Sequence, residues 1–87
     1  MYEMSLIHDL IKKIETIAKK NNASKITQAK VRLGALSHIS ADHFREHFVE
    51  ATAGTVAQGA KLNIEIATDI TDPHAQDILL ISVGVDD

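Results

Sequence analysis

The sequence predicts an α+β domain, a two-layer sandwich in which two helices pack on a three-stranded mixed sheet, in the order α-β-α-β-β. Residues 6–18 and 41–53 repeat apolar side chains at helical spacing, residues 25–34 and 61–67 alternate with a period of two, and residues 77–85 are strongly apolar. Two helices on one face of a three-stranded sheet is the simplest two-layer solution for a chain of 87 residues. We therefore expect residues 1–87 to form a single domain.

The composition limits the classes of function. The hydrophobic fraction is 45% and almost entirely aliphatic, which indicates a packed core rather than disorder. The net charge of −3 is mixed along the chain, so no basic field predicts a nucleic-acid partner, and no apolar run has the length of a membrane span. Charges interrupt the apolar residues from the start, unlike a signal peptide. With no Cys there is no disulfide or thiolate site, and we expect a cytoplasmic protein.

The first helix opens within the first six residues and runs to about Lys20. Its apolar residues recur three and four apart, the spacing of one buried face. They are Ile7, Leu10, Ile11, Ile14, Ile17 and Ala18. Asn21-Asn22 can take the left-handed conformation that ends a helix. The amino end of the chain is therefore expected to be held against the folded body.

The next two elements have clear boundaries. In residues 25–34, Ala29, Val31 and Leu33 point to one side of a strand, and Gly34 ends it. The second helix, from about Ala41 to Ala53, has Ser40 as its N-cap and Gly54 just past its end. Its buried stripe comprises Phe44, Phe48 and Ala51, with Ala41 one turn before it, the methyl of Thr52 at its edge, and Ile39 packing on Phe44 as a hydrophobic staple.

The last third of the chain predicts two more strands. Leu62, Ile64 and Ile66 alternate as the inward face of residues 61–67. Residues 69–76 contain Asp72-Pro73 and form a loop across which the last two strands could pair as a hairpin. The strand over residues 77–85 is expected to be covered on more of its surface, with Gly84 marking a bulge. The helix between the first two strands indicates a crossover connection.

His43 and His47 are four residues apart on the second helix, a spacing that can place two imidazoles on one metal ion. The motif lacks a third ligand, and two solvated histidines beside the Phe44 and Phe48 stripe are the favoured interpretation. His8 lies one turn beyond Met4, near the start of the chain, where an exposed helical histidine is again favoured. Ser37, His38 and Asp42 are close in sequence, but loops often bring such residues together. No arrangement indicates acid–base or nucleophilic catalysis, so we do not expect an enzyme.

The amino terminus is the remaining candidate site. An α-amino group loses its proton near neutral pH, and with the following backbone amides it offers several nitrogens in one plane, a set that suits Ni(II) or Cu(II). Tyr2 is bulky, so Met1 is expected to be retained. Because every protein has an amino terminus, this pattern alone carries little weight.

Three segments carry a family resemblance. The opening Met1-Tyr2-Glu3-Met4-Ser5-Leu6 resembles the Met-His-Glu-Met-Ser-Leu opening of the HypA/HybF nickel chaperones of hydrogenase and, in some organisms, urease maturation. Residues 31–37 are similar to the family's strand and Gly-Ala-Leu-Ser turn, and residues 54–64 to its Gly-Thr-x-Ala-x-Gly-Ala-x-Leu-x-Ile segment. Residues 77–86 fit the closing strand less closely. In order, these segments cover nearly the whole chain.

The resemblance implies a metal site at Met1, Tyr2 and Glu3, and the sequence departs from the family in two places. The family's His at position 2 gives nickel an imidazole, which the Tyr2 phenol replaces poorly. The amine of Met1 carries over, as does Glu3, through its backbone and a side chain that can steady the site. The family also inserts a zinc-binding region with paired Cys-x-x-Cys motifs, where this chain has only the loop 69–76. We therefore expect nickel and no zinc.

The resemblance implies a HypA-like nickel-binding maturation factor for NiFe hydrogenase or urease, with nickel binding weakened by Tyr2. The implied partners are a HypB-like GTPase and the hydrogenase large subunit or the urease apparatus, with the first helix as the surface to test. The alternative is a metal-free protein-interaction module that kept the fold and lost the chaperone chemistry.

Overall fold

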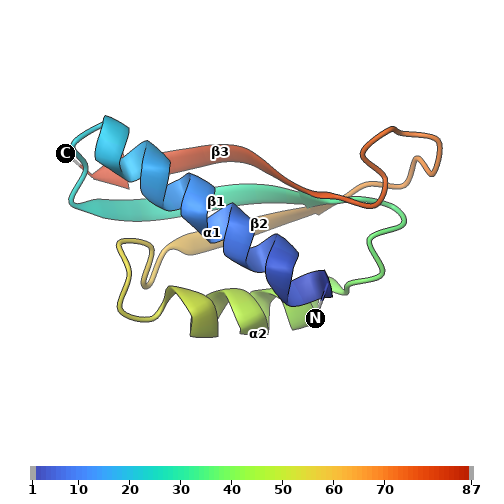
Figure 1. Cartoon of the computed structure of the whole chain (residues 1–87), viewed down its shortest axis with the longest axis horizontal. Helices are drawn as coiled ribbons and strands as arrows, with labels where there is room; N and C mark the ends of the chain where they lie inside the picture. Colours follow the sequence, from blue (N-terminus) through green and yellow to red (C-terminus); the bar gives the residue numbers. More distant parts are fainter. Residues whose placement is uncertain (1, 87) are drawn as a thin grey trace.

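The computed structural model describes residues 2–86. The elements are α1 (Tyr2–Lys20), β1 (Lys25–Leu33), α2 (Ala41–Thr52), β2 (Lys61–Ile66) and β3 (Ile78–Asp86). The strands form one sheet; α1 packs on β1, β3 and α2, and α2 packs on β2 (Figure 1). The predicted α+β two-layer fold is confirmed, including the element order and the mixed sheet. Within the described range, no helix is both long and apolar enough to cross a membrane.

The buried side of α1 is the predicted one. Ile7, Leu10, Ile11, Ile14 and Ala18 are buried, and Ile17 is half-buried. Asn22 has a φ of 51° and the Asn21 side chain donates to the carbonyl oxygen of Ile17, so the two asparagines end the helix as expected. This row of side chains fixes α1 along most of its length.

The strand order is β2-β1-β3, with β1 parallel to β2 and antiparallel to β3. The crossover through α2 is therefore confirmed. The expected hairpin between the last two strands is wrong, because each of them pairs with β1 on a different edge. The chain between β2 and β3 passes over the end of β1 instead of turning back on β2.

A bulge changes the alternation of β1. Ile26 and Ala29 are both buried although their positions differ by three, because the register shifts at Thr27. Gly84 pairs with Gln28 next to this shift, and a Cβ on Gly84 would lie 2.6 Å from Cγ of Gln28. The bulge predicted around Gly84 is present, with the extra residue on the opposite strand.

Two expectations about the later strands are wrong. Ile66 was expected to point into the core, but it is 61% exposed because it ends a strand at the outer edge of the sheet. β3 was expected to be covered on more of its surface, yet it is also an edge strand and only Ile78 is buried among its described side chains. A second register shift leaves Ile81 unpaired and 40% exposed.

The capping and packing of α2 follow the prediction. The hydroxyl of Ser40 accepts a hydrogen bond from the amide of His43 at 3.1 Å, and Gly54 has a φ of 81° just past the helix end. Phe44 and Phe48 are fully buried, with ring centroids 6.0 Å apart. Thr52 is also buried, and its hydroxyl donates to the carbonyl oxygen of Phe48.

The loop after β2 is folded onto the end of β1. The amide of Gly34 donates to the carbonyl oxygen of Asp77, and the amide of Leu36 donates to that of Ala75, at 2.9 and 2.7 Å. Asp69 and Asp72 each accept a hydrogen bond from a backbone amide two residues later, so the loop is built from consecutive turns. Ala75 is buried by this packing.

Candidate metal centre

The predicted metal site falls at the start of α1. Met1 lies outside the described residues, whereas the backbones of Tyr2 and Glu3 form the first two positions of the helix. The first amides of a helix have no acceptor within the helix. The backbone nitrogens of Tyr2 and Glu3 are therefore not used by the helical ladder.

The start of α1 is continuous with a segment that the core fixes. Ile7 is fully buried and Leu6 packs partly against the core, one turn after the predicted ligands. α1 packs on α2, and in the view of Figure 1 its first turn overlaps the beginning of that helix. Both helices are anchored by buried side chains, so the described part of α1 has a fixed position.

The electrostatic potential at the start of α1 disfavours the binding of a cation. The aligned peptide dipoles place a partial positive charge at this end. A divalent ion bound here therefore needs anionic or strongly donating ligands, such as deprotonated amide nitrogens or carboxylates, to offset the dipole. The residue types at positions 1–3 offer an amine, amide nitrogens and one carboxylate.

His43 and His47 stack on each other. Their ring centroids are 4.6 Å apart with an interplanar angle of 30°, and His47 is half-buried whereas His43 is exposed. The expectation of two solvated histidines therefore holds for His43 and only partly for His47. Within the described part of the chain, no group of three or more His, Cys, Asp or Glu side chains is placed to hold a metal ion. The pair alone is an incomplete site.

His8 lies on the exposed surface of α1, as the sequence predicted. It lines a shallow pocket of about 250 Å³ between the two helices, together with Ile11, Lys12, Glu15, Ala51 and Thr55. His38 and His74 are exposed in separate loops, and Nδ1 of His74 is 3.0 Å from a carboxylate oxygen of Asp77. Ser37, His38 and Asp42 make no hydrogen bonds with one another among the described contacts, so the structure adds no catalytic arrangement there.

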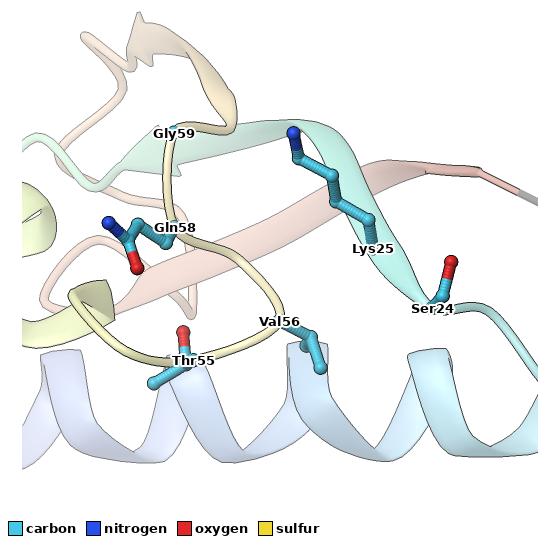
Figure 2. A pocket seen from close by; sticks show the side chains of 6 residues that line it. All are labelled: Ser24, Lys25, Thr55, Val56, Gln58 and Gly59. Atoms are coloured by element: carbon cyan, nitrogen blue, oxygen red, sulfur yellow. The ribbon is translucent and has the colours of Figure 1, made fainter.

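A second surface pocket, of about 540 Å³, was not singled out from the sequence. In Figure 2 the loop 55–59 curves along one side, and Ser24 and Lys25 line the other. The polar side chains of the loop make hydrogen bonds within the loop and to the end of α2. The Thr55 hydroxyl donates to the carbonyl oxygen of Thr52 and accepts from the amide of Ala57, and Oε1 of Gln58 accepts from the amide of Gly54. Gly54 and Gly59 both have positive φ, so these two glycines are the sequence signal for the tight turns of this loop.

The only ion pairs among the described residues that shift a carboxyl pKa lie away from both helices. Nε of Arg32 donates to Oε1 of Glu65 at 2.8 Å, and Nζ of Lys30 is 3.7 Å from the other oxygen. The Arg32 hydrogen bond and charge hold the pKa of Glu65 below its ordinary value, with a smaller contribution from Lys30. This cluster joins β1 to β2 and has no part in the candidate site.

Comparison with known proteins gives consistent matches. The family model described as "Hydrogenase/urease nickel incorporation, metallochaperone, hypA" matches residues 1–71. The hydrogenase maturation factor HypA of Methylocella silvestris is 38% identical over 66 residues, covering 76% of this chain and 58% of the relative. That of Archaeoglobus fulgidus is 35% identical over 66 residues, covering 76% and 60%. The chain thus spans somewhat more than half the length of these relatives.

The fold has close counterparts among solved structures. The solution structure of the Ni metallochaperone HypA from Helicobacter pylori superposes with a TM-score of 0.78 at 20% identity, covering 95% of this chain and 96% of that one. A second solution structure of a HypA protein gives a TM-score of 0.75 at 23% identity, covering 98% and 96%. The family match includes α1, β1, α2 and β2, and the structural match extends over β3. This chain belongs to the HypA family.

Proposed function

We propose that the protein is a HypA-like nickel-binding maturation factor for NiFe hydrogenase or urease, which carries nickel as cargo in the cytoplasm and is not an enzyme. The support is that the family match begins at residue 1 and that the matched relatives are named as hydrogenase maturation factors. The structural neighbour from Helicobacter pylori is itself described as a Ni metallochaperone.

In this proposal the ligands are the amine of Met1 and the backbone nitrogens of Tyr2 and Glu3, and the side chain of Glu3 can steady the site. The observation that carries the proposal is the position of Tyr2 and Glu3 in the first turn of a helix whose next turn is anchored by Ile7. An anchored helix start reduces the conformational entropy that these nitrogens lose on metal binding.

Nickel binding at this site is weakened by Tyr2. A phenol offers a hard oxygen that is protonated at neutral pH, whereas an imidazole offers a neutral nitrogen that Ni(II) prefers. Tyr2→His is therefore expected to bind nickel more tightly than the parent.

The remaining parts of the proposal concern organisation and partners. The loop 69–76 takes the place of the family's zinc-binding region, so the protein binds no zinc and residues 1–87 act as one nickel domain. The partners are a HypB-like GTPase and the hydrogenase large subunit or the urease apparatus. The exposed face of α1, with Lys12, Lys13, Lys19 and Lys20, is the surface proposed for docking.

The test is a nickel titration by calorimetry at pH 7.5 of protein that starts at Met1 without a tag, beside Tyr2→His and beside parent protein acetylated at its amine. Micromolar or tighter binding that disappears on acetylation supports the proposal. Unchanged binding after acetylation contradicts the terminal site.

The second candidate is a metal-free interaction module, which the Tyr2 substitution itself favours. It predicts no nickel binding by the parent and a gain of binding in Tyr2→His. The same titration therefore separates the two functions.

A further inference from the structure

The two edges of the sheet differ in how they are protected. β2, at one edge, is six residues long and carries Lys61 and Glu65, and the carbonyl oxygen of Leu62 accepts a hydrogen bond from Nη1 of Arg45 at 3.1 Å. β3, at the other edge, is nine residues long and has no charged side chain from Ile78 to Val85. A short strand, charged side chains and side-chain cover all keep an edge strand from pairing with another chain. The edge of β3 is therefore the less protected of the two.

The first part of β3 is regular and has a free side. Ile78, Leu79 and Leu80 pair in register with β1, and the register shift leaves Ile81 unpaired after them. Among the described residues β3 pairs with β1 alone, so the backbone groups on its other side have no strand partner. In Figure 1 this side of β3 is the upper border of the sheet. The run from Ile78 to Leu80 can therefore form hydrogen bonds with an added strand.

A groove lies between α1 and this part of β3. It consists of two pockets, of about 310 and 440 Å³, that share Lys13 and Leu79. Its apolar walls include Leu10 and Ile17 of α1 and Leu80 of β3. Successive side chains of a strand point to opposite faces, yet Leu79 and Leu80 both line the larger pocket. The edge of β3 is therefore part of the groove wall.

The charged side chains of the groove follow an order along α1. Asp9 lines the smaller pocket together with Asp77, Lys12 lines the larger pocket, and Lys13 lines both. No ion pair among the described residues involves Asp9, Lys12 or Lys13. Asp9 and the two lysines are about 5–6 Å apart along the helix axis. Side chains on one face of a strand repeat every about 6.8 Å, so a base and an acid two positions apart match these charges.

We infer that this groove binds an extended segment of a partner protein, which adds to the sheet as a fourth strand beside β3. The segment presents a basic and an acidic side chain, two positions apart, to Asp9 and to Lys13, and its intervening side chains are aliphatic and lie next to Leu79. Backbone hydrogen bonds supply the affinity, and the order of charges supplies the selectivity. The inference refines the docking surface of α1 in the proposed function, and it requires no nickel.

The test titrates the full, metal-free, isotope-labelled chain with a peptide of the sequence Thr-Val-Arg-Val-Glu-Val-Thr, blocked at both ends, and follows the amide signals by NMR. Saturable shifts are expected at Leu79, Leu80 and Ile81. The control peptide is N-methylated at its central valine and its glutamate. Alternate amides of a strand point to opposite edges, so this change removes a donor from each edge and should abolish saturable binding. Equal binding of the two peptides overturns the inference.

Charge reversal in the groove provides the second test. Lys13→Glu should weaken binding of the peptide by at least about threefold, because an attraction becomes a repulsion. Lys19→Glu is the matched control, since it makes the same charge change at an exposed position in the last turn of α1 and should stay within about twofold of the parent. A peptide with lysine in place of its glutamate should regain affinity for Lys13→Glu.

Three other results also overturn the inference. They are equal weakening by Lys13→Glu and Lys19→Glu, shifts confined to β2, and no saturable binding by the parent. Because the peptide titration contains no metal, its failure leaves the nickel titration of the proposed function unaffected. Failure of the nickel titration likewise leaves the groove to be judged by the peptide alone.

Discussion

Gly34 and Ala75 are in direct backbone contact where the loop 69–76 crosses the end of β1. A Cβ on Gly34 would overlap the carbonyl oxygen of Ala75 and lie 2.7 Å from that of His74. The hydrogen bonds from the amide of Gly34 to the carbonyl oxygen of Asp77 and from the amide of Leu36 to that of Ala75 depend on that close approach. The glycine that ends the first strand is therefore required by packing rather than by its own backbone conformation.

Gly34→Ala is expected to lower the free energy of unfolding by about 1–3 kcal/mol, because the methyl group meets backbone atoms that cannot rotate away. Gly84→Ala is the matched control, since its Cβ would meet side-chain atoms of Thr27 and Gln28 that can move. Urea unfolding followed by circular dichroism measures both. Equal losses in the two variants would contradict the packing argument.

Ile14→Ala is expected to cost about 2–5 kcal/mol, because Ile14 is fully buried in the middle of α1 and the substitution leaves a cavity. That is a large part of the total stability of a small domain. Val49→Ala on α2, at a position 63% exposed, should change stability by no more than about 0.5 kcal/mol. A loss for Ile14→Ala as small as that for Val49→Ala would show that α1 is not fixed to the sheet.

Ser40→Ala is expected to destabilise the protein by about 1 kcal/mol, because the amide of His43 loses its hydrogen-bond acceptor at the start of α2. Ser40→Asp keeps an acceptor at the cap and should retain most of the stability. Thermal unfolding of the three proteins at one concentration provides the comparison. If alanine and aspartate behave alike, the cap has no measurable role.

The pKa of Glu65 is expected to rise in Arg32→Gln, because the hydrogen bond and charge that lower it are removed. Since the folded pKa lies below the unfolded one, the paired carboxylate contributes stability above the unfolded pKa and loses it as pH falls through the folded pKa. The stability difference between the parent and Glu65→Gln should therefore be present at pH 7 and should become smaller at an acidic pH below the ordinary pKa of a glutamate, about 4.3. Carboxyl NMR titration and urea unfolding at both pH values test this, and a difference of equal size in acid would contradict it.

Much of the fold could be predicted from local patterns. The spacing from Ile7 to Ala18 identified α1 and its buried face, and Ser40 and Gly54 bounded α2 to within a residue. These signals are local, so they do not depend on which strands pair. The strand pairing is not a local property, and no pattern in residues 61–85 indicates that β2 and β3 pair with opposite edges of β1. The short loop between them favoured the prediction of a hairpin instead.

The alternation of side chains also failed where the sheet is irregular. The shift at Thr27 lets Ile26 and Ala29 share a face, and the unpaired Ile81 breaks the pattern of β3. Ile66 has the spacing of a core residue but ends an edge strand. For the candidate site, spacing alone gave only the two histidines of α2, and the amino terminus drew its weight from family resemblance. That α1 packs on α2 became visible only in three dimensions.

β1 is the central strand of the sheet, and β3, the last nine described residues, covers one of its two edges. Clipping within the loop 69–76 and loss of the C-terminal piece would leave β1 with an open row of amide and carbonyl groups beside a dry interior. An exposed strand edge can pair with a strand of another copy of the chain. The shortened protein should therefore self-associate through its β1 edge.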